Sequence, residues 1–366
     1  MSSEELLYIL ALQHIPNLGD TTAKKLIGHF GTAKNVLKQR KQNLLEIDGI
    51  GAYRLSGFFD VTHLKAAEEE LKFIEKNNIK TLYFKDSDYP DKLKHCIDGP
   101  VLLFQRGNIN LNNQKIISVV GTRKITQSGV AFCEKFIEEL SPLNPIIVSG
   151  FAYGVDITAH KAAVANRLQN IGCLAHGLNQ IYPKVHQKYV SSVEENGGFF
   201  TDFWSSDDFD RNNFLKRNRI IAGLSEATVV IESAEKGGSL VTADIANSYN
   251  REVFAVPGRP ADKFSKGCNN LIKSQKAHLL NSAADLIYML NWKPEEAIKP
   301  VQKQMFVELD AEENNILDFL QKEGKAQLDS IALNCNFPSY KAAGILINME
   351  LKGVVRPLPG KLFELI

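Results

Sequence analysis

Short apolar runs recur through the middle of the chain, separated by stretches long enough to form helices. Most of these runs lack polar alternation, as expected for strands buried on both faces of a sheet. They occupy residues 79–84, 101–104, 116–120, 146–148, 171–175, 199–203, 228–231 and 253–256. Their alternation with helices predicts the α/β class, with a Rossmann-like, doubly wound and mostly parallel sheet over residues 79–292.

The first 78 residues have a different pattern, in which short helical stretches are interrupted by glycine turns. The segments 15–20 (Ile-Pro-Asn-Leu-Gly-Asp) and 47–51 (Ile-Asp-Gly-Ile-Gly) each lead into a helix-like run. This spacing is typical of a helix-hairpin-helix pair, whose turns present backbone N–H groups to a phosphate. Two ordinary helical hairpins that only pack together would give the same pattern, so both interpretations stay open.

Beyond the predicted sheet the chain divides twice more. Residues 293–305 hold two prolines among charges, which indicates a linker. The pattern that follows predicts helices near 312–322, 328–335 and 338–352 and a hairpin at 354–365 with Pro-Gly at its tip. Three helices followed by a hairpin predict a winged helix over residues 306–366.

Composition and charge exclude several classes of protein. The chain has 366 residues, 44% of them hydrophobic, with 43 basic and 42 acidic side chains and a net charge of +1. Any nucleic-acid site must therefore be a local basic patch. The acidic start is unlike a secretory signal and no stretch predicts a membrane span, so we expect a cytoplasmic protein without membrane contact. The five cysteines are too far apart for a zinc or disulfide motif.

Candidate binding loops follow the predicted strands, where a doubly wound sheet holds its ligands. Gly121, Thr122 and Arg123 end one strand, and Ser149 and Gly150 end another. Glycine allows close approach of an anion to the backbone, so two such turns side by side would form a phosphate cradle. Each turn alone is weak evidence, because glycine between a strand and a helix is often required only by geometry.

Two further segments add positive charge. Lys184 lies in a Tyr-Pro-Lys loop, and residues 211–224 carry four cations and no anion around an aromatic ring. The candidates in this second segment are Phe214, Arg217, Asn218 and Arg219. Cations beside a ring suit single-stranded nucleic acid, whose bases can stack on it. A basic amphipathic helix with Phe214 in the core explains the segment equally well. We further expect Arg123, Arg217 and Arg219 to form one positive pocket.

Catalytic and cofactor motifs are missing from the sequence. It contains no HExxH, GxSxG, P-loop or GxGxxG pattern. His160, His176 and His186 have no metal-ligand spacing, and Asp156 has no obvious carboxylate partner. We therefore expect no catalytic residues, no metal and no cofactor, and a protein that is not an enzyme.

The order of these motifs resembles the DNA-processing protein DprA (Smf) family. The resemblance rests on Val-Gly-Thr-Arg at 120–123, Val-Ser-Gly-Phe-Ala-Tyr-Gly-Val-Asp at 148–156, Tyr-Pro at 182–183 and Phe-x-x-Arg-Asn-Arg-Ile-Ile-Ala-Gly at 214–223. It continues through Gly-Ser-Leu-Val-Thr-Ala at 238–243 and Val-Phe-Ala-Val-Pro-Gly at 253–258, and so covers about 80–290. The flanks are similar to the helix-hairpin-helix (SAM-like) and winged-helix domains of many members.

The resemblance implies a protein that binds and protects incoming single-stranded DNA, forms a homodimer through the Rossmann-like domain and loads RecA recombinase during natural transformation. It maps DNA contacts onto Gly121, Thr122, Arg123, Lys184, Phe214, Arg217, Asn218 and Arg219. The sequence departs from the family pattern at Leu215, at His186 and at Thr201-Asp202, where proline, asparagine and Ser-Glu are common.

A second function remains open. Residues 237–242 (Gly-Gly-Ser-Leu-Val-Thr) are also similar to the Gly-Gly-x-Gly-Thr turn of Rossmann-like nucleoside-monophosphate phosphoribohydrolases. That motif normally has a glutamate just after its threonine, whereas Ala243 and Asp244 stand here.

The charge of the predicted winged helix argues against a duplex reader. Residues 306–366 hold nine acidic and six basic side chains. The segment 338–352, at the position of a recognition helix, offers only Lys341 and Lys352. We expect a protein-contact or regulatory module.

Overall fold

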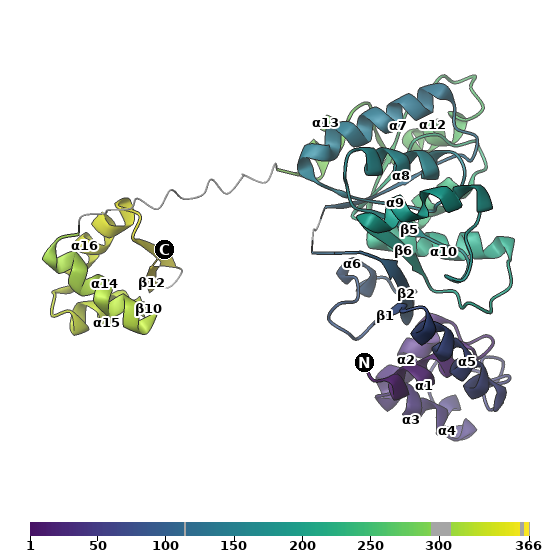
Figure 1. Ribbon diagram of the computed structural model, residues 1–366, viewed down its shortest axis with the longest axis horizontal. Helices are drawn as coiled ribbons and strands as arrows, with labels where there is room; N and C mark the ends of the chain where they lie inside the picture. The colour runs from purple at the N-terminus through teal and green to yellow at the C-terminus, as the bar shows by residue number, and fades with distance from the viewer. Residues whose placement is uncertain (113–114, 294–308, 359–361, 366) are drawn as a thin grey trace. The chain divides into compact units, whose positions relative to one another are not determined.

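The chain divides into two units, Met1–Pro294 and Glu295–Ile366. The computed structural model describes residues 1–112, 115–293, 309–358 and 362–365 (Figure 1). The tip of the predicted hairpin and nearly all of the predicted linker lie outside the described residues.

A nine-stranded sheet forms the centre of the first unit within the described residues. Its spatial order is β1-β2-β6-β5-β4-β3-β7-β8-β9. All neighbours from β6 to β9 pair in parallel, while β2 pairs antiparallel with both β1 and β6. The bounds are β1 Lys80–Tyr83, β2 Leu102–Gly107, β3 Ile116–Val120, β4 Ile146–Ser149, β5 Asn170–Cys173, β6 Gly197–Thr201, β7 Ala227–Val230, β8 Glu252–Ala255 and β9 His278–Leu279. The predicted doubly wound, mostly parallel sheet is confirmed.

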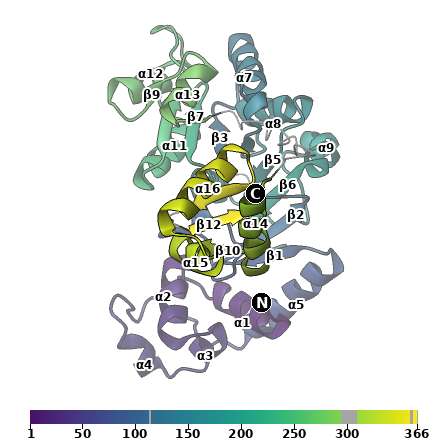
Figure 2. The ribbon, with the colours of Figure 1, turned by 90° about the vertical axis from the view of Figure 1, so that its left-hand side faces the viewer.

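Helices cover both faces of this sheet (Figures 1 and 2). On β3, Ile117 and Val119 pack with the helices of one face, and Ile116 and Val120 pack with those of the other. The first face carries α7 (Gln127–Leu140), α8 (Val155–Ala165), α13 (Ala283–Met289) and, towards β6, η2 (Lys184–Tyr189) and α9 (Val190–Glu195); η1 (Ser141–Leu143) extends α7. The second carries α6 (Asp91–Lys94), α10 (Arg211–Leu224), α11 (Gly238–Ser248) and α12 (Lys266–Lys273).

All eight predicted strands are present, and their ends differ from the predicted ends by a few residues. The pattern missed β9, which has two exposed residues and therefore no apolar run to reveal it. Neither could the pattern show that β2 runs antiparallel to β6, because pairing direction depends on how the connections cross the sheet.

Five helices precede the sheet and share a hydrophobic core with it. They are α1 (Ser3–Gln13), α2 (Asp20–Phe30), α3 (Ala33–Leu37), α4 (Lys41–Leu45) and α5 (Thr62–Lys76). Leu10 and Leu26 from these helices belong to the same buried cluster as Leu102 and Phe104 of β2. The N-terminal helices are thus anchored on the α/β part of the first unit.

The two glycine turns of this region differ in structure. The first joins α1 to α2 as predicted. The second, after α4, leads into consecutive turns over residues 52–59 closed by i to i+3 hydrogen bonds, such as that from Arg54 N to the Gly51 carbonyl. The helix expected after the second turn is therefore wrong. Gly57 has φ +76°, a left-handed conformation that interrupts any helix.

The start of α2 packs against the α/β part of the unit. One Asp20 carboxylate oxygen accepts from the Val101 backbone N–H at 2.8 Å, and the other accepts from Arg219 of α10 at 2.9 Å. Arg219 also pairs with Asp202 and donates to the Asp98 carbonyl at 2.7 Å. This first hairpin is used for packing, which favours the second of the two interpretations of its sequence.

Arg219 is consequently misplaced in the predicted basic pocket. Arg217 and Arg219 are two residues apart on α10, so their side chains leave the helix about 200° apart. Arg217 lies on the side of Phe214, and Arg219 lies beneath the N-terminal helices. The expectation of one pocket holding Arg123, Arg217 and Arg219 is therefore wrong for Arg219.

The second unit contains three helices and a small sheet. Its helices are α14 (Ala311–Glu323), α15 (Leu328–Asn334) and α16 (Ser339–Leu351). Its strands are β10 (Lys325–Gln327), β11 (Val355–Leu358) and β12 (Leu362–Leu365), in the antiparallel order β10-β12-β11. The predicted winged helix is confirmed, with β10 as an element that the sequence pattern did not show. Among the described residues of both units, no helix has the length and apolarity to cross a membrane.

The ion pair between α2 and α10 gives a testable consequence. Arg219→Ala leaves Asp20 and Asp202 without their cation, so we expect the free energy of unfolding to fall by about 3–5 kcal/mol. Lys216→Ala, an exposed lysine on the same helix, should change it by no more than about 0.5 kcal/mol. Urea denaturation of both variants measures the difference, and equal stability of the two would contradict a structural role for Arg219.

Candidate functional site

A cavity of about 650 Å³ opens at the carboxyl edge of the sheet, between the turns that follow β3 and β7. The connection after β3 passes over one face of the sheet to β4, and the connection after β7 passes over the other face to β8, which makes this the point where doubly wound folds bind ligands. The cavity is lined by Val120–Arg123, Ala152, Asp156, Tyr182, Phe209, Arg211, Phe214, Leu215, Arg217, Asn218, Ile221, Ser233, Ala234, Lys236–Ser239 and Thr242. We call it the switch-point pocket.

The turns after β3 and β4 interlock at the base of this pocket. The Thr122 carbonyl accepts from the Val155 backbone N–H at 3.1 Å, and the Thr122 N–H donates to the Glu232 carbonyl at 2.7 Å. Gly154 has φ +77°, and a Cβ there would overlap the backbone of Thr122 and Arg123. The two turns therefore lie side by side, as the sequence predicted, and glycine is required for that approach.

Arg217 supports the pocket from below. It is only 4% exposed, and its guanidinium donates to the carbonyls of Gly150, at 2.7 Å, and Cys173. Burial raises the pKa of the neighbouring Asp156 carboxyl, and the positive charge of Arg217 opposes that shift. A Cβ at Gly150 would strike both charged groups, so this glycine makes room for the pair.

Arg123 and Phe214 form the wall of the pocket. The Arg123 guanidinium lies over the Phe214 ring, 5.0 Å from its centroid. The Phe214 ring packs against two other rings, with its centroid 5.8 Å from that of Tyr182 and 5.6 Å from that of Phe209. Because Phe214 is only half-buried, it is not part of the core. An arginine beside an aromatic cluster offers both a charge for a phosphate and faces on which a base can stack.

The first turn of α11 is a part of the pocket that our candidate residues missed. Gly237, Gly238 and Ser239 line the cavity, and the first N–H groups of a helix have no partner within it. Asn218 of α10 ties the two helices together by donating to the Gly238 carbonyl at 3.3 Å. The signal was present in the Gly-Gly-Ser turn after a strand, which contributes to the family resemblance and to the hydrolase alternative but not to the candidate DNA contacts.

Several candidate residues lie outside the pocket lining. Ser149 is buried and donates to the Val119 carbonyl at 2.6 Å, so it joins adjacent strands. Gly150 acts through the space it leaves for Arg217. Lys184 is exposed at the start of η2, next to the loop that supplies Tyr182. The lining of the pocket thus includes Gly121, Thr122, Arg123, Phe214, Arg217 and Asn218. The remaining four candidates do not line it, although Gly150 contacts Arg217 behind the lining.

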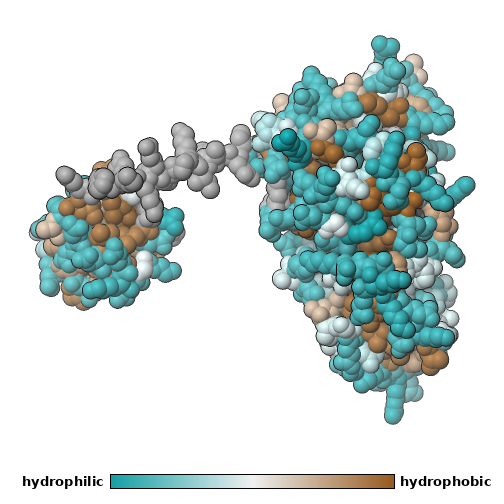
Figure 3. All heavy atoms as spheres, viewed as in Figure 1, coloured by the Kyte–Doolittle hydropathy of each residue, from teal (hydrophilic) through white to brown (hydrophobic). Residues whose placement is uncertain are grey.

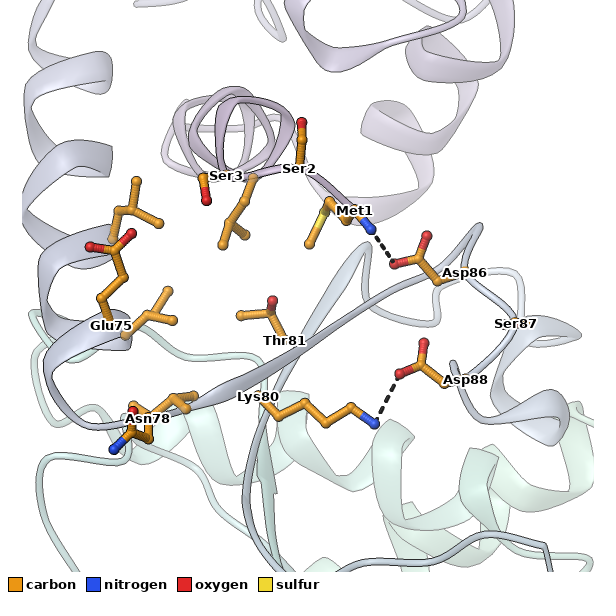
Figure 4. A pocket seen from close by; sticks show the side chains of 14 residues that line it. Met1, Ser2, Ser3, Glu75, Asn78, Lys80, Thr81, Asp86, Ser87 and Asp88 are labelled. Atoms are coloured by element: carbon orange, nitrogen blue, oxygen red, sulfur yellow. Dashed lines mark ion pairs between the residues drawn. The ribbon is translucent and has the colours of Figure 1, made fainter.

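Charge distinguishes the switch-point pocket from a larger cavity. Its lining includes Arg123, Arg211, Arg217 and Lys236 but a single carboxylate among the described residues, Asp156. The larger cavity, of about 840 Å³, lies between α1, α5 and β1 (Figure 4). Its lining carries three acidic side chains, Glu75, Asp86 and Asp88. The one lysine of the lining, Lys80, pairs with Asp88 at 2.9 Å. A phosphate therefore suits the switch-point pocket and not the larger cavity.

Three histidines of the first unit, His160, His176 and His186, do not supply further positive charge. Burial lowers the pKa of His160 to about 4, so this ring is neutral at physiological pH. Its Nδ1 lies 2.9 Å from the Asn170 side-chain oxygen. Burial also lowers the pKa values of His176 and His186. Within the described part of the chain, no group of three or more His, Cys, Asp or Glu side chains is arranged to hold a metal ion.

Comparison with known proteins relates this geometry to a family. Residues 80–291 match the family described as DNA recombination-mediator protein A, and residues 305–361 match the DprA winged helix domain. The chain belongs to the DNA recombination-mediator protein A family. The winged helix of the second unit accordingly matches the DprA winged helix domain.

Individual relatives agree with this membership. Protein Smf of Escherichia coli is 32% identical over 305 residues, which is 81% of this chain and 80% of that protein. DNA processing protein DprA of Streptococcus pneumoniae is 36% identical over 202 residues, which is 55% of this chain and 71% of that protein. The X-ray structure of the Streptococcus pneumoniae protein superposes with a TM-score of 0.64 at 29% identity, covering 79% of this chain and 98% of that one. The structure of DNA processing protein A of Helicobacter pylori superposes with a TM-score of 0.53 at 26% identity, covering 58% of this chain and 95% of that one.

Proposed function

We propose that the chain binds single-stranded DNA in the switch-point pocket, without making or breaking bonds. The observation that carries the proposal is the Arg123 guanidinium over the Phe214 ring, beside the first turn of α11. This arrangement supplies a cation, an aromatic surface and backbone donors within one pocket. The Helicobacter pylori relative is described as having a unique single-stranded DNA binding mode, which supports the same ligand for this chain.

The expected contacts divide by chemistry. Arg123, Arg211 and Lys236 would displace counterions from the backbone, and the N–H groups of the α11 turn would hold a phosphate. A base would stack on Phe214 or its neighbouring rings, which requires an unpaired strand because duplex bases are already stacked. Arg217 would act indirectly, by holding the turn after β4 in place, because its guanidinium already donates to the carbonyls of Gly150 and Cys173.

Family membership supports a wider role. We propose that the protein forms a homodimer through its Rossmann-like part, protects incoming single strands in the cytoplasm and loads RecA recombinase on them during natural transformation. A strand-exchange assay with RecA and strands coated by single-strand-binding protein tests the loading step. Acceleration by this protein is the expected result, and an unchanged rate over a range of protein concentrations would exclude loading.

The hydrolase alternative rests on the Gly-Gly turn of α11. The only carboxylate among the described lining residues is Asp156, which is buried beside Arg217, and Asp244 pairs with Lys276 on the surface at 3.0 Å. No exposed acid therefore stands where a hydrolase needs one, and we propose that the protein is not an enzyme. Release of free base from nucleoside monophosphates would overturn this part of the proposal.

The main proposal predicts a preference for single strands. Titration of labelled oligonucleotides at several salt concentrations should show tighter binding to a single strand than to its duplex, with little dependence on sequence. Equal affinity for both forms, or no binding at low salt, would contradict the proposal.

Arg123→Ala should weaken single-strand binding and reduce the dependence of the logarithm of affinity on the logarithm of salt concentration by about 0.7 for one lost phosphate contact. Lys124→Ala is the matched control, because Lys124 is the next residue, is exposed and is not among the lining residues. Equal salt slopes for Arg123→Ala and the unmodified protein would exclude Arg123 from the phosphate contacts.

Phe214→Ala should cost about 1–3 kcal/mol of single-strand binding if the ring stacks on a base. Because the ring is half-buried, the loss in unfolding free energy should stay below the roughly 3–5 kcal/mol typical of a core phenylalanine. Phe59→Ala, which removes an exposed ring from the turns before α5, is the control. Thermal melting beside the binding titration separates the two effects.

The winged helix gives a further prediction. Lys341 pairs with Glu312 and Lys352 pairs with Glu313 at 2.5 Å, so both lysines of the segment 338–352 are already bound to acids of α14. Three large apolar side chains of α16 are also exposed, Tyr340 by 81%, Ile347 by 55% and Leu351 by 82%, and Figure 3 shows apolar side chains gathered on the visible side of this unit.

We therefore expect a chain truncated at residue 295 to keep its single-strand affinity to within tenfold, about 1.4 kcal/mol. Gel-shift titration of the full and truncated chains checks this, because the first unit has hydrophobic cores of its own. A larger loss, or binding of duplex DNA by the isolated second unit at physiological salt, would restore a DNA-reading role to the winged helix.

A further inference from the structure

The segment 202–210 joins β6 to α10 and connects the N-terminal helices with the switch-point pocket. Its first half lies in a cavity of about 400 Å³ bordered by α1 and α2, which is lined in part by Asp202, Phe203, Trp204 and Asp207. Its second half carries Phe209, which lines the switch-point pocket. We call residues 202–210 the connecting loop.

Glu70 of α5 holds the first half of this loop. One carboxylate oxygen accepts from the Ser205 backbone N–H at 2.9 Å, and the other accepts from the Ser205 hydroxyl at 2.5 Å. Glu70 is 4% exposed, and no cation pairs with it in the described residues. Burial raises the pKa of this carboxyl, and the two bonds from Ser205 oppose the shift. A buried carboxylate without a cation is costly, so its place depends on these two donors.

Three further contacts restrain the same residues. Gln13 of α1 accepts from the Trp204 indole N–H at 3.0 Å, and the His14 ring lies 5.2 Å from the Trp204 ring. From the α/β side, the Asn179 side chain donates to the Ser205 carbonyl at 2.8 Å. The loop is therefore held between the N-terminal helices and the sheet.

The C-terminal end of the connecting loop forms part of the switch-point pocket. The centroid of the Phe209 ring lies 4.7 Å from that of the Tyr182 ring and 5.6 Å from that of the Phe214 ring. Asp210 caps α10 by accepting from the Asn212 backbone N–H at 2.8 Å. Because only three residues separate Ser205 from Phe209, a shift of Ser205 moves the ring that packs on Phe214.

We propose that Glu70 is a positioning residue for the single-strand pocket, acting through Ser205 and the connecting loop on Phe209. The proposal rests on the proposed function of the pocket. It gives the N-terminal helices a part in DNA binding that needs no contact between these helices and DNA.

The test is a double-mutant cycle in the full-length chain. Glu70→Ala removes both acceptors of Ser205, and single-strand affinity should fall about fivefold to tenfold, within the usual range of coupling between sites. In the Phe209→Ala background, Glu70→Ala should change affinity less than twofold, because the ring it positions is gone. Glu69→Ala removes the same charge from the adjacent, exposed residue of α5 and should leave affinity unchanged.

Two variants separate positioning from general destabilisation. Glu70→Gln keeps an acceptor for the Ser205 N–H and a donor for its hydroxyl, so it should restore affinity to within about twofold. Gln13→Ala removes only the acceptor of Trp204 and serves if Glu70→Ala does not fold. In a Trp292→Phe background the fluorescence of Trp204 should shift in Glu70→Ala and in Gln13→Ala but not in Glu69→Ala.

The outcomes distinguish this inference from the proposed function. If the unmodified chain does not bind single strands, the proposed function fails. If it binds and Phe209→Ala weakens binding, but Glu70→Ala and Gln13→Ala leave affinity unchanged, the positioning role alone is overturned. Equal losses from Glu70→Ala with and without Phe209 would also overturn it, because the effect would not pass through that ring.

Discussion

The close approach of the turns after β3 and β4 is the constraint on which the site depends. Parallel strands bring their carboxyl ends to one edge, so the chain there must reverse into helices within a few residues. The bond between the Thr122 carbonyl and the Val155 N–H holds the two turns together, and Gly154 allows this approach because a side chain there would overlap the backbone of Thr122 and Arg123. Arg123 can reach Phe214 on α10 because its turn is fixed in this way.

Two arginines of α10, Arg217 and Arg219, have different structural roles. Arg217 supports the turns through the carbonyls of Gly150 and Cys173, whereas Arg219 joins the N-terminal helices to the sheet through Asp20 and Asp202. Two residues along a helix is a change of direction of about 200°, so the same basic segment serves two sides of the unit. Positive charge in the sequence therefore indicated a binding helix without showing which cations reach solvent.

The flanking regions depart furthest from what their fold names imply. Helical hairpins and winged helices are both familiar DNA-binding elements, yet fold alone does not establish function. Here the first hairpin uses Asp20 to dock on the sheet, and Lys341 and Lys352 are paired with acids of α14. The contacts of Asp20 lie within the first unit, and the lysine–glutamate pairs lie within the second.

The sequence by itself determined most of the elements and their order, although it did not show the short strands β9 and β10. Runs such as 116–120 are strands because their apolar residues must be buried on both faces, and the glycines at 121 and 154 mark turns that tolerate no side chain. Helical periodicity in residues 211–224 could also have separated Arg219 from Phe214, Arg217 and Asn218. Only the tertiary structure decided the rest. The pairing of Glu70 with Ser205, the docking of Asp20 on Arg219 and the entry of the α11 turn into the pocket join residues far apart in the chain. Local pattern carries no information about such contacts, because they arise from how the packed elements meet.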